Sequence, residues 1–115
     1  MTDFASTVAR IRTFRDARDW MQFHNPKNLA ISISLEAGEL LEHFQWKSME
    51  ESEAHAKEAK SEIAEEMADI AIYLFEMADN LGVDLLSAVD GKLEKNEAKY
   101  PVAKARGSSA KYTEL

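Results

Sequence analysis

The sequence predicts an all-α protein built from four helices. Glycine is sparse, with four residues in 115, and the only two prolines, Pro26 and Pro101, fall at natural boundaries between segments. Apolar residues recur every three or four positions over most of the chain, which is the spacing of one helix face. The length suits one domain with a modest core.

Capping residues mark the first two helices. Thr2 or Asp3 can cap a first helix that ends near Arg18. The pair Asn25-Pro26 combines a cap with proline in the first turn, so we expect a second helix from there to about Gln45. The apolar positions of these two helices are Phe4, Val8, Ile11 and Phe14, then Leu29, Ile33, Ala37, Leu40, Leu41 and Phe44.

The second half of the chain carries two more helical patterns. Residues Lys47–Ala59 are charged and lack large apolar residues apart from one methionine, so we expect a connector there. A third helix follows to about Leu81, where Gly82 can supply a left-handed stop. Asp84 can cap a fourth helix that ends before Pro101. We therefore predict a helical domain over residues 1–101 and a basic, irregular tail over residues 102–115.

The third helix has more apolar surface than one small bundle can bury. Ile72, Phe75 and Ala78 lie outside its main apolar seam, so we expect a homo-oligomer that covers them. The seam repeats like a heptad and consists of Ile63, Met67, Ile70, Leu74, Met77 and Leu81.

Composition excludes several classes of protein. Cysteine is absent, so neither a disulfide nor a thiolate zinc site can form. The formal net charge of −7 argues against a general nucleic-acid binder. We see neither an apolar run of transmembrane length nor a signal-peptide pattern, and we expect no membrane partner and a cytoplasmic location.

Two pairs of acidic residues stand in apolar surroundings. Glu36 and Glu39 are three residues apart, as are Glu66 and Asp69, so each pair shares one helix face. Packing two such faces together gathers four carboxylates, and each pair of like charges roughly 4 Å apart costs about 4 kcal/mol at an effective dielectric near 20. A hard divalent cation removes this cost, and carboxylate ligands suit magnesium or manganese.

A plainer interpretation stays open at this point. The same acidic spacing recurs in polar surroundings, for example at Glu50 and Glu53, where a solvated face explains it. If all the acids were surface charge, the chain would be a non-enzymatic helical interaction module.

Aromatic and polar residues form a second unusual set. Aromatic faces beside a metal centre suit a flat nucleobase, because stacking works for every base. Ordinary core packing is the alternative for each of them. Lys92 and Asn96, four residues apart on one helix face, are positioned to contact a phosphate and a sugar hydroxyl, although a solvated helix end also explains them. The remaining candidates are Trp20, His24, Asn28, Trp46 and Tyr73.

Taken together, these residues resemble the MazG-like all-α nucleoside triphosphate pyrophosphohydrolases, and most closely the dCTP pyrophosphatase branch. The family signature, Glu-x-x-Glu followed by Glu-x-x-Asp, is matched by Glu36, Glu39, Glu66 and Asp69. The similarity also covers Arg18–Trp20, Phe23–Leu29, Gly38–Leu40, Phe44–Lys47, Ile72–Leu74, Val83–Leu85, Tyr100-Pro101 and Lys111–Leu115.

The resemblance implies a four-helix core in a homodimer or homotetramer, and magnesium-dependent cleavage between the α- and β-phosphates. A (d)NTP, foremost dCTP or a related deoxynucleotide, would yield a (d)NMP and pyrophosphate in house-cleaning or control of the nucleotide pool. The four acids would bind metal and act in catalysis. The resemblance suggests Trp20, His24, Trp46 and Tyr73 for the base and sugar pocket, and Lys92 and Asn96 for phosphate and sugar contacts.

One departure bears on the substrate. Members of the dCTP branch can carry histidine in the first helix, where this chain has Ile11. The resemblance therefore constrains the reaction more tightly than the base. A pyrophosphohydrolase acting on another phosphoanhydride, such as phosphoribosyl-ATP, is the alternative enzyme.

Overall fold

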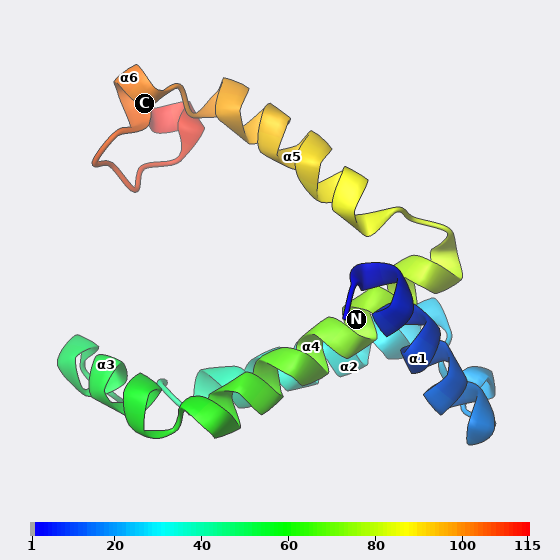
Figure 1. Cartoon of the computed structure of the whole chain (residues 1–115). Helices are drawn as coiled ribbons and strands as arrows, with labels where there is room; N and C mark the ends of the chain where they lie inside the picture. Colours follow the sequence, from blue (N-terminus) through cyan, green and yellow to red (C-terminus); the bar gives the residue numbers. More distant parts are fainter. Residues whose placement is uncertain (1) are drawn as a thin grey trace. The chain divides into compact units, whose positions relative to one another are not determined.

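The computed structural model describes residues 2–115, and every regular element in that range is helical, which confirms the predicted all-α class. None of the helices in this range is long and apolar enough to cross a membrane. Within these described residues, six α-helices and two short 3₁₀-helices are present where four helices were predicted. In chain order they are α1 (Phe4–Ala17), η1 (Met21–Phe23), α2 (Pro26–Glu42), α3 (Met49–Glu58), α4 (Lys60–Leu81), α5 (Leu85–Lys99), α6 (Val102–Ala105) and η2 (Tyr112–Glu114) (Figure 1).

The predicted helix starts are confirmed by their caps. The Asp3 side chain accepts from the Ser6 backbone N–H at 2.8 Å and caps α1. The Asn25 side chain accepts from the Asn28 N–H at 2.9 Å and caps α2, with proline in its first turn. The Asp84 side chain caps α5 in the same way. Each carboxylate or amide oxygen satisfies an N–H that has no partner within the helix.

The connector predicted over Lys47–Ala59 is wrong, because most of it forms α3. Ser48 Oγ accepts from the Glu51 N–H at 3.2 Å, and Glu51 Oε1 accepts from the Ser48 N–H at 2.9 Å, a complete capping box. The segment is rich in Ala, Glu and Lys, which are good helix formers. Its lack of apolar periodicity hid the helix from a pattern-based prediction. Helix α2 also ends at Glu42, slightly before the predicted Gln45.

The chain divides into two compact units, one ending at Leu81 and the other spanning Gly82–Leu115. Gly82 adopts a φ of 69°, the left-handed conformation predicted for the end of the long helix. Within the second unit, the tail that was predicted to be irregular contains two short helical segments, α6 and η2.

In the first unit, α2 packs along α4, and α1 and α3 each contact α4 (Figure 1). The two long helices run antiparallel, because His24 just before α2 meets Glu76 late in α4, whereas Glu39 meets Glu66 earlier in α4. An ion pair ties α1 to α4: the Arg12 guanidinium donates to both carboxylate oxygens of Asp79, at 2.8 and 3.0 Å.

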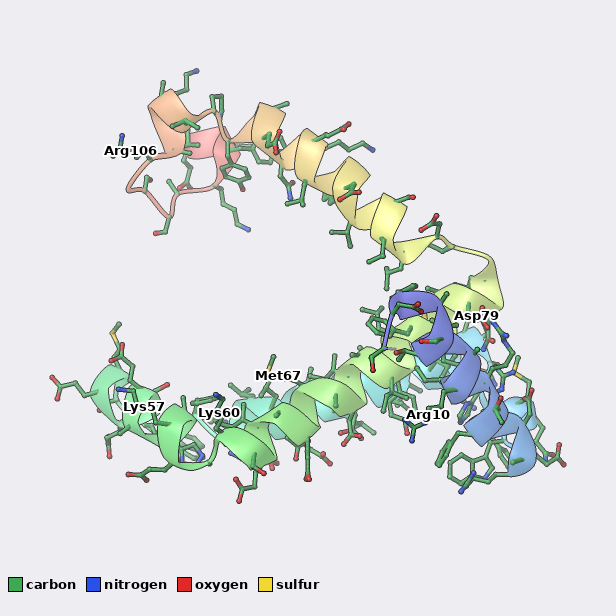
Figure 2. The ribbon with its side chains drawn as sticks, viewed as in Figure 1. Arg10, Lys57, Lys60, Met67, Asp79 and Arg106 are labelled. Atoms are coloured by element: carbon green, nitrogen blue, oxygen red, sulfur yellow. The ribbon has the colours of Figure 1, made fainter. Side chains whose placement is uncertain are left out.

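Few apolar side chains are fully buried in this arrangement. Among residues 2–115 only Val8, Leu29 and Ala78 are buried hydrophobics. Half of the predicted apolar seam of α4 lies open: Met67, labelled in Figure 2, is 57% exposed, and Leu74 and Leu81 are exposed as well. Only the other half of the seam, which is partly buried, therefore packs within a single chain.

Candidate functional site

Carboxylates from two helices meet at the centre of the α2–α4 pair. Glu36 and Glu39 project from α2, and Glu66 projects from α4. One carboxylate oxygen of each residue lies within 4.8 Å of the others. The i, i+3 spacing puts the first two on one face of α2, and antiparallel packing brings α4 opposite them. Three of the four acids predicted from the sequence are thus gathered in one place.

The fourth acid, Asp69, lies close by without joining that triplet. It is one turn beyond Glu66 on α4, and it lines a cavity together with Glu36. Its negative charge also contributes to the raised pKa of both Glu36 and Glu66.

Burial and the repulsion of neighbouring carboxylates disfavour the charged forms of Glu36 and Glu66. Burial, with the close approach of Glu39, raises the pKa of Glu36 from 4.5 to about 7. The same causes raise the pKa of Glu66, opposed by the positive charge that His43 can carry. One oxygen each of Glu36 and Glu66 (Oε2) is buried and has no hydrogen-bond partner among residues 2–115.

These observations test whether a metal fits. A buried carboxylate oxygen with no donor is costly, and so is a cluster of like charges. A divalent cation bound by Glu36, Glu39 and Glu66 would satisfy both orphaned oxygens and neutralise the cluster. An all-oxygen ligand set of this kind is the one that hard cations prefer.

A cavity of about 260 Å³ connects the acidic cluster to aromatic side chains. Glu36 and Asp69 form its acidic end. Neighbouring rings approach one another along the wall, with centroid separations of 5.7 Å for Phe14–Trp20, 6.2 Å for Trp20–His24 and 6.3 Å for His24–Tyr73. The lining residues are Ile11, Phe14, Arg15, Trp20, His24, Glu36, Asp69, Ile72, Tyr73 and Glu76.

The same cavity is also lined by a buried network of charged and polar side chains. Glu76 is 3% exposed, and its carboxylate accepts from His24 Nδ1 at 2.7 Å. Arg15 is 6% exposed, and its guanidinium lies 3.8 Å from the same carboxylate. It donates to Asn80 at 2.9 Å and to Asp16 at 2.8 Å. Both buried charges are therefore paired, as low dielectric requires.

Tyr73 links the two ends of the cavity. Burial raises the pKa of its phenol, and the charges of Glu36, Asp69 and Glu76 raise it further. The hydroxyl therefore stays protonated and can donate a hydrogen bond in the cavity.

The other predicted binding residues lie elsewhere. Asn28 donates from its side chain to the Phe23 carbonyl at 2.9 Å, which holds the turn before α2. Trp46 is 88% exposed and does not line the cavity. Lys92 and Asn96 lie on α5 in the second unit, so their contacts with a substrate stay a prediction.

Sequence reasoning missed Arg15 and its role as the partner of Glu76. Arg15 stands among the polar residues of an amphipathic helix, where a lone arginine is expected to be exposed to solvent. The sequence therefore gave no indication that it is buried. Ile11, the position where the dCTP branch can carry histidine, was singled out and does line the cavity.

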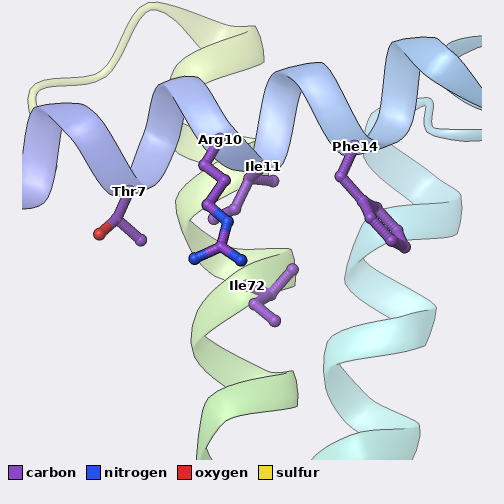
Figure 3. A pocket seen from close by; sticks show the side chains of 5 residues that line it. All are labelled: Thr7, Arg10, Ile11, Phe14 and Ile72. Carbon is purple, nitrogen blue, oxygen red and sulfur yellow. The ribbon is translucent and has the colours of Figure 1, made fainter. Parts of the chain in front are cut away.

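An apolar cavity of about 320 Å³ lies beside the first, between α1 and α4. Figure 3 shows Arg10 and Ile11 extending from α1 toward Ile72 of α4. Ile11, Phe14 and Ile72 line both cavities, so they form the wall between them. Among residues 2–115, no carboxylate lines this second cavity, so it takes no part in the acidic cluster.

On the other side of the acids a third hollow of about 550 Å³ opens to solvent. Two histidines meet there, with Nδ1 of His43 2.9 Å from Nε2 of His55. The hollow is lined by Glu39, Glu42, His43, Lys47, His55 and Glu66. The carboxylate cluster therefore has a mostly apolar, aromatic cavity on one side and a polar one on the other.

The fold and the site together define a class of protein. Its members are all-helical domains in which two long helices hold a carboxylate cluster with unpaired buried oxygens beside an aromatic cavity. The model of the MazG-like family matches residues 31–115, and the chain belongs to that family. A solved structure of a pyrophosphatase from Archaeoglobus fulgidus is similar, with a TM-score of 0.84 and 44% identity, covering 88% of this chain and 94% of that one.

Two dCTP pyrophosphatases are also similar to this chain in sequence. The dCTP pyrophosphatase 1 of Rattus norvegicus is 46% identical over 104 residues, and that of Homo sapiens is 43% identical over 104 residues. Each match covers 89% of this chain and 61% of the relative. The chain thus spans about three fifths of the length of these relatives.

Proposed function

We propose that this chain is a metal-dependent nucleoside triphosphate pyrophosphohydrolase that converts dCTP or a related deoxynucleotide to the monophosphate and pyrophosphate. One observation carries the proposal: a single cavity joins a carboxylate cluster with orphaned buried oxygens to a wall of aromatic rings. A nucleotide has the matching layout, with a flat base at one end and a metal-binding phosphate chain at the other. The names of the relatives support the same reaction.

The metal would be magnesium, with manganese as a substitute, held by Glu36, Glu39, Glu66 and Asp69. When bound, it would neutralise the triphosphate and position water for attack on the α-phosphorus. The chain's own part is to hold the carboxylates rigidly on two packed helices, because positioning contributes much of the rate in such reactions.

Water is the expected nucleophile. The chain has no cysteine, and the residues that line the cavity include no serine. One carboxylate of the cluster would orient the water and accept its proton while the bond to the β-phosphate breaks.

The base would stack in the aromatic part of the cavity, between Trp20 and Tyr73, with His24 at the edge. Phe14 and Ile72 complete an apolar surround. Trp46 and Asn28 lie outside this cavity and are kept as proposed substrate contacts, and Lys92 and Asn96 as proposed phosphate and sugar contacts. Cytosine is the expected base, on the strength of the relatives' names.

The working protein would be a homodimer or homotetramer in the cytoplasm, without nucleic-acid or membrane partners. Support for self-association comes from the exposed apolar side chains of the first unit, among them Phe14, Leu35, Met67 and Leu74. A second copy of the chain is the simplest cover for such a surface.

A non-enzymatic interaction module explains the site less well. Surface charge would leave its carboxylates hydrated, whereas Glu36 and Glu66 each keep a buried oxygen without a donor. A reaction on another phosphoanhydride uses the same cluster, and only a substrate comparison separates it from the proposed one.

The test is pyrophosphate release from a panel of canonical and modified triphosphates in magnesium, with phosphoribosyl-ATP included. The wild type should be active, with a cytosine deoxynucleotide at or near the top. Glu39→Gln and Asp69→Asn should lose turnover while keeping helicity, because charge is removed with little change in shape. Glu53→Gln, an exposed residue of α3, is the matched control. Turnover by Glu39→Gln equal to that of the control would overturn the assignment.

A further inference from the structure

The hollow beyond the carboxylate cluster has the chemistry of an anion site. Lys47 supplies an ammonium group, and the half-buried pair of His43 and His55 supplies imidazole nitrogens. Three carboxylates line the same hollow, so a bare anion would be repelled, whereas an anion that carries a divalent cation would satisfy both kinds of group.

The histidine pair keeps a donor available. In the 2.9 Å contact one ring donates its N–H and the other accepts. In a neutral pair joined this way, exactly one of the two remaining nitrogens, Nε2 of His43 or Nδ1 of His55, carries a hydrogen. The pair therefore offers one N–H donor to a ligand in the hollow, whichever ring donates in the contact.

The order of groups along the two antiparallel helices gives the hollow a direction. His24 and Glu76 lie at the aromatic end, Glu36 and Asp69 follow, and Glu39 and Glu66 come next. The histidine pair and Lys47 lie beyond them. A nucleotide with its base in the aromatic cavity and its α-phosphate at the carboxylates therefore has its terminal phosphates on the side of this hollow.

The aromatic cavity cannot serve the terminal phosphates instead. Arg15 is the only lysine or arginine that lines it among residues 2–115. That guanidinium is already bonded to Asp16 and Asn80 and lies against Glu76. A second phosphate-binding position must come from outside that cavity.

We infer that Lys47, His43 and His55 form a subsite for the β- and γ-phosphates of the substrate, and hence for the pyrophosphate that leaves. The inference rests on the proposed function and adds the direction of the substrate. The base lies toward Trp20, and the leaving group departs toward α3. Bond breakage between the α- and β-phosphates then separates two products that are held on opposite sides of the carboxylate cluster.

The experiment measures product binding rather than turnover. Inorganic pyrophosphate and dCMP are titrated separately, by calorimetry with magnesium present, into the full chain and its variants. Lys47→Gln and His55→Gln should each weaken pyrophosphate binding about tenfold, because the first removes a positive charge and the second breaks the histidine pair that presents the N–H donor. Both should leave dCMP binding unchanged, and Trp20→Ala should show the opposite pattern. Lys57→Gln, on α3 but outside the hollow, is the matched control.

Two results would overturn the inference. One is a pyrophosphate affinity of both subsite variants equal to that of Lys57→Gln, which would make the histidine pair a purely structural contact between α3 and the end of α2. The other is an equal loss of pyrophosphate and dCMP binding, which would mean that the variants disturb the whole site. A wild type that releases pyrophosphate from triphosphates in either case keeps the proposed function. A wild type inactive on every triphosphate overturns that function instead.

Discussion

His24 Nδ1 lies 2.7 Å from Oε2 of Glu76, across 52 residues of sequence. The contact fixes the histidine ring at the aromatic end of the cavity. Because a carboxylate only accepts, Nδ1 must carry the hydrogen, and in the neutral ring Nε2 is left as an acceptor. The proposed base, cytosine, fits such an acceptor, because its exocyclic amino group donates whereas the carbonyl of uracil only accepts.

Glu76→Gln should lower the free energy of unfolding by on the order of 3 kcal/mol, because it removes the buried carboxylate that accepts from His24 and faces the Arg15 guanidinium. The guanidinium then keeps only the half-exposed Asp16 as its counter-charge. Urea denaturation measures the change. Glu65→Gln, exposed on the same helix, should alter stability by less than about 0.5 kcal/mol. Equal stability of the two variants would mean that the buried pair contributes nothing.

The metal-free protein should lose stability as the pH rises from about 4.5 to about 7. The folded-state pKa of Glu36, about 7, lies above its ordinary value of 4.5, so the folded state binds this proton more tightly than the unfolded state does. The stability that this tighter proton binding contributes is complete below the ordinary pKa of 4.5. It is lost as the pH rises through the folded-state pKa of about 7. Glu36→Gln should therefore be more stable than the wild type at pH 8 in chelator, by thermal denaturation, and the difference should shrink toward pH 4.5. Identical pH profiles for the two proteins would contradict the raised pKa.

Magnesium should raise the melting temperature of the wild type, since a ligand that binds only the folded state stabilises it. Glu36→Gln should show a much smaller rise, because it lacks one of the clustered ligands. The comparison is made at pH 8, where the wild-type carboxylate is ionised. A rise of the same size in both proteins would place the metal elsewhere.

Trp20→Ala and Tyr73→Ala should each weaken nucleotide binding by about 1–3 kcal/mol if their rings stack the base. Calorimetry with calcium in place of magnesium stalls the reaction and measures binding alone. Phe23→Ala removes an exposed aromatic side chain that does not line the cavity, and it should leave the affinity unchanged. Unchanged affinity in the first two variants would return both rings to a packing role.

Sedimentation velocity should show the wild type as a dimer or a larger assembly. Met67→Lys and Leu74→Lys place a charge on the exposed seam of α4 and should shift the protein toward monomer. Glu65→Lys places a charge on the same helix at a residue that is already polar, and should leave the assembly intact. A monomeric wild type with full activity would refute the proposed assembly.

The helical framework could be predicted from the sequence because its determinants are local. Asp3, Asn25 and Asp84 cap the helices that they were expected to cap, and Gly82 takes the left-handed conformation that ends α4. A cap depends on hydrogen bonds between residues three positions apart, so the sequence contains all of it. Helix α3 was missed although its capping box and its helix-forming residues are local too. The prediction relied on apolar periodicity, which this segment lacks.

The choice of candidate acids also came from the sequence, since Glu36, Glu39, Glu66 and Asp69 could be separated from other acids by their apolar neighbours. Only the tertiary structure decided which of them meet, and that Glu36 and Glu66 keep an unpaired buried oxygen. It alone paired Arg15 and His24 with Glu76, and His43 with His55. Burial and charge pairing between distant segments depend on how α1, α2, α3 and α4 pack, and that packing follows from no single stretch of sequence.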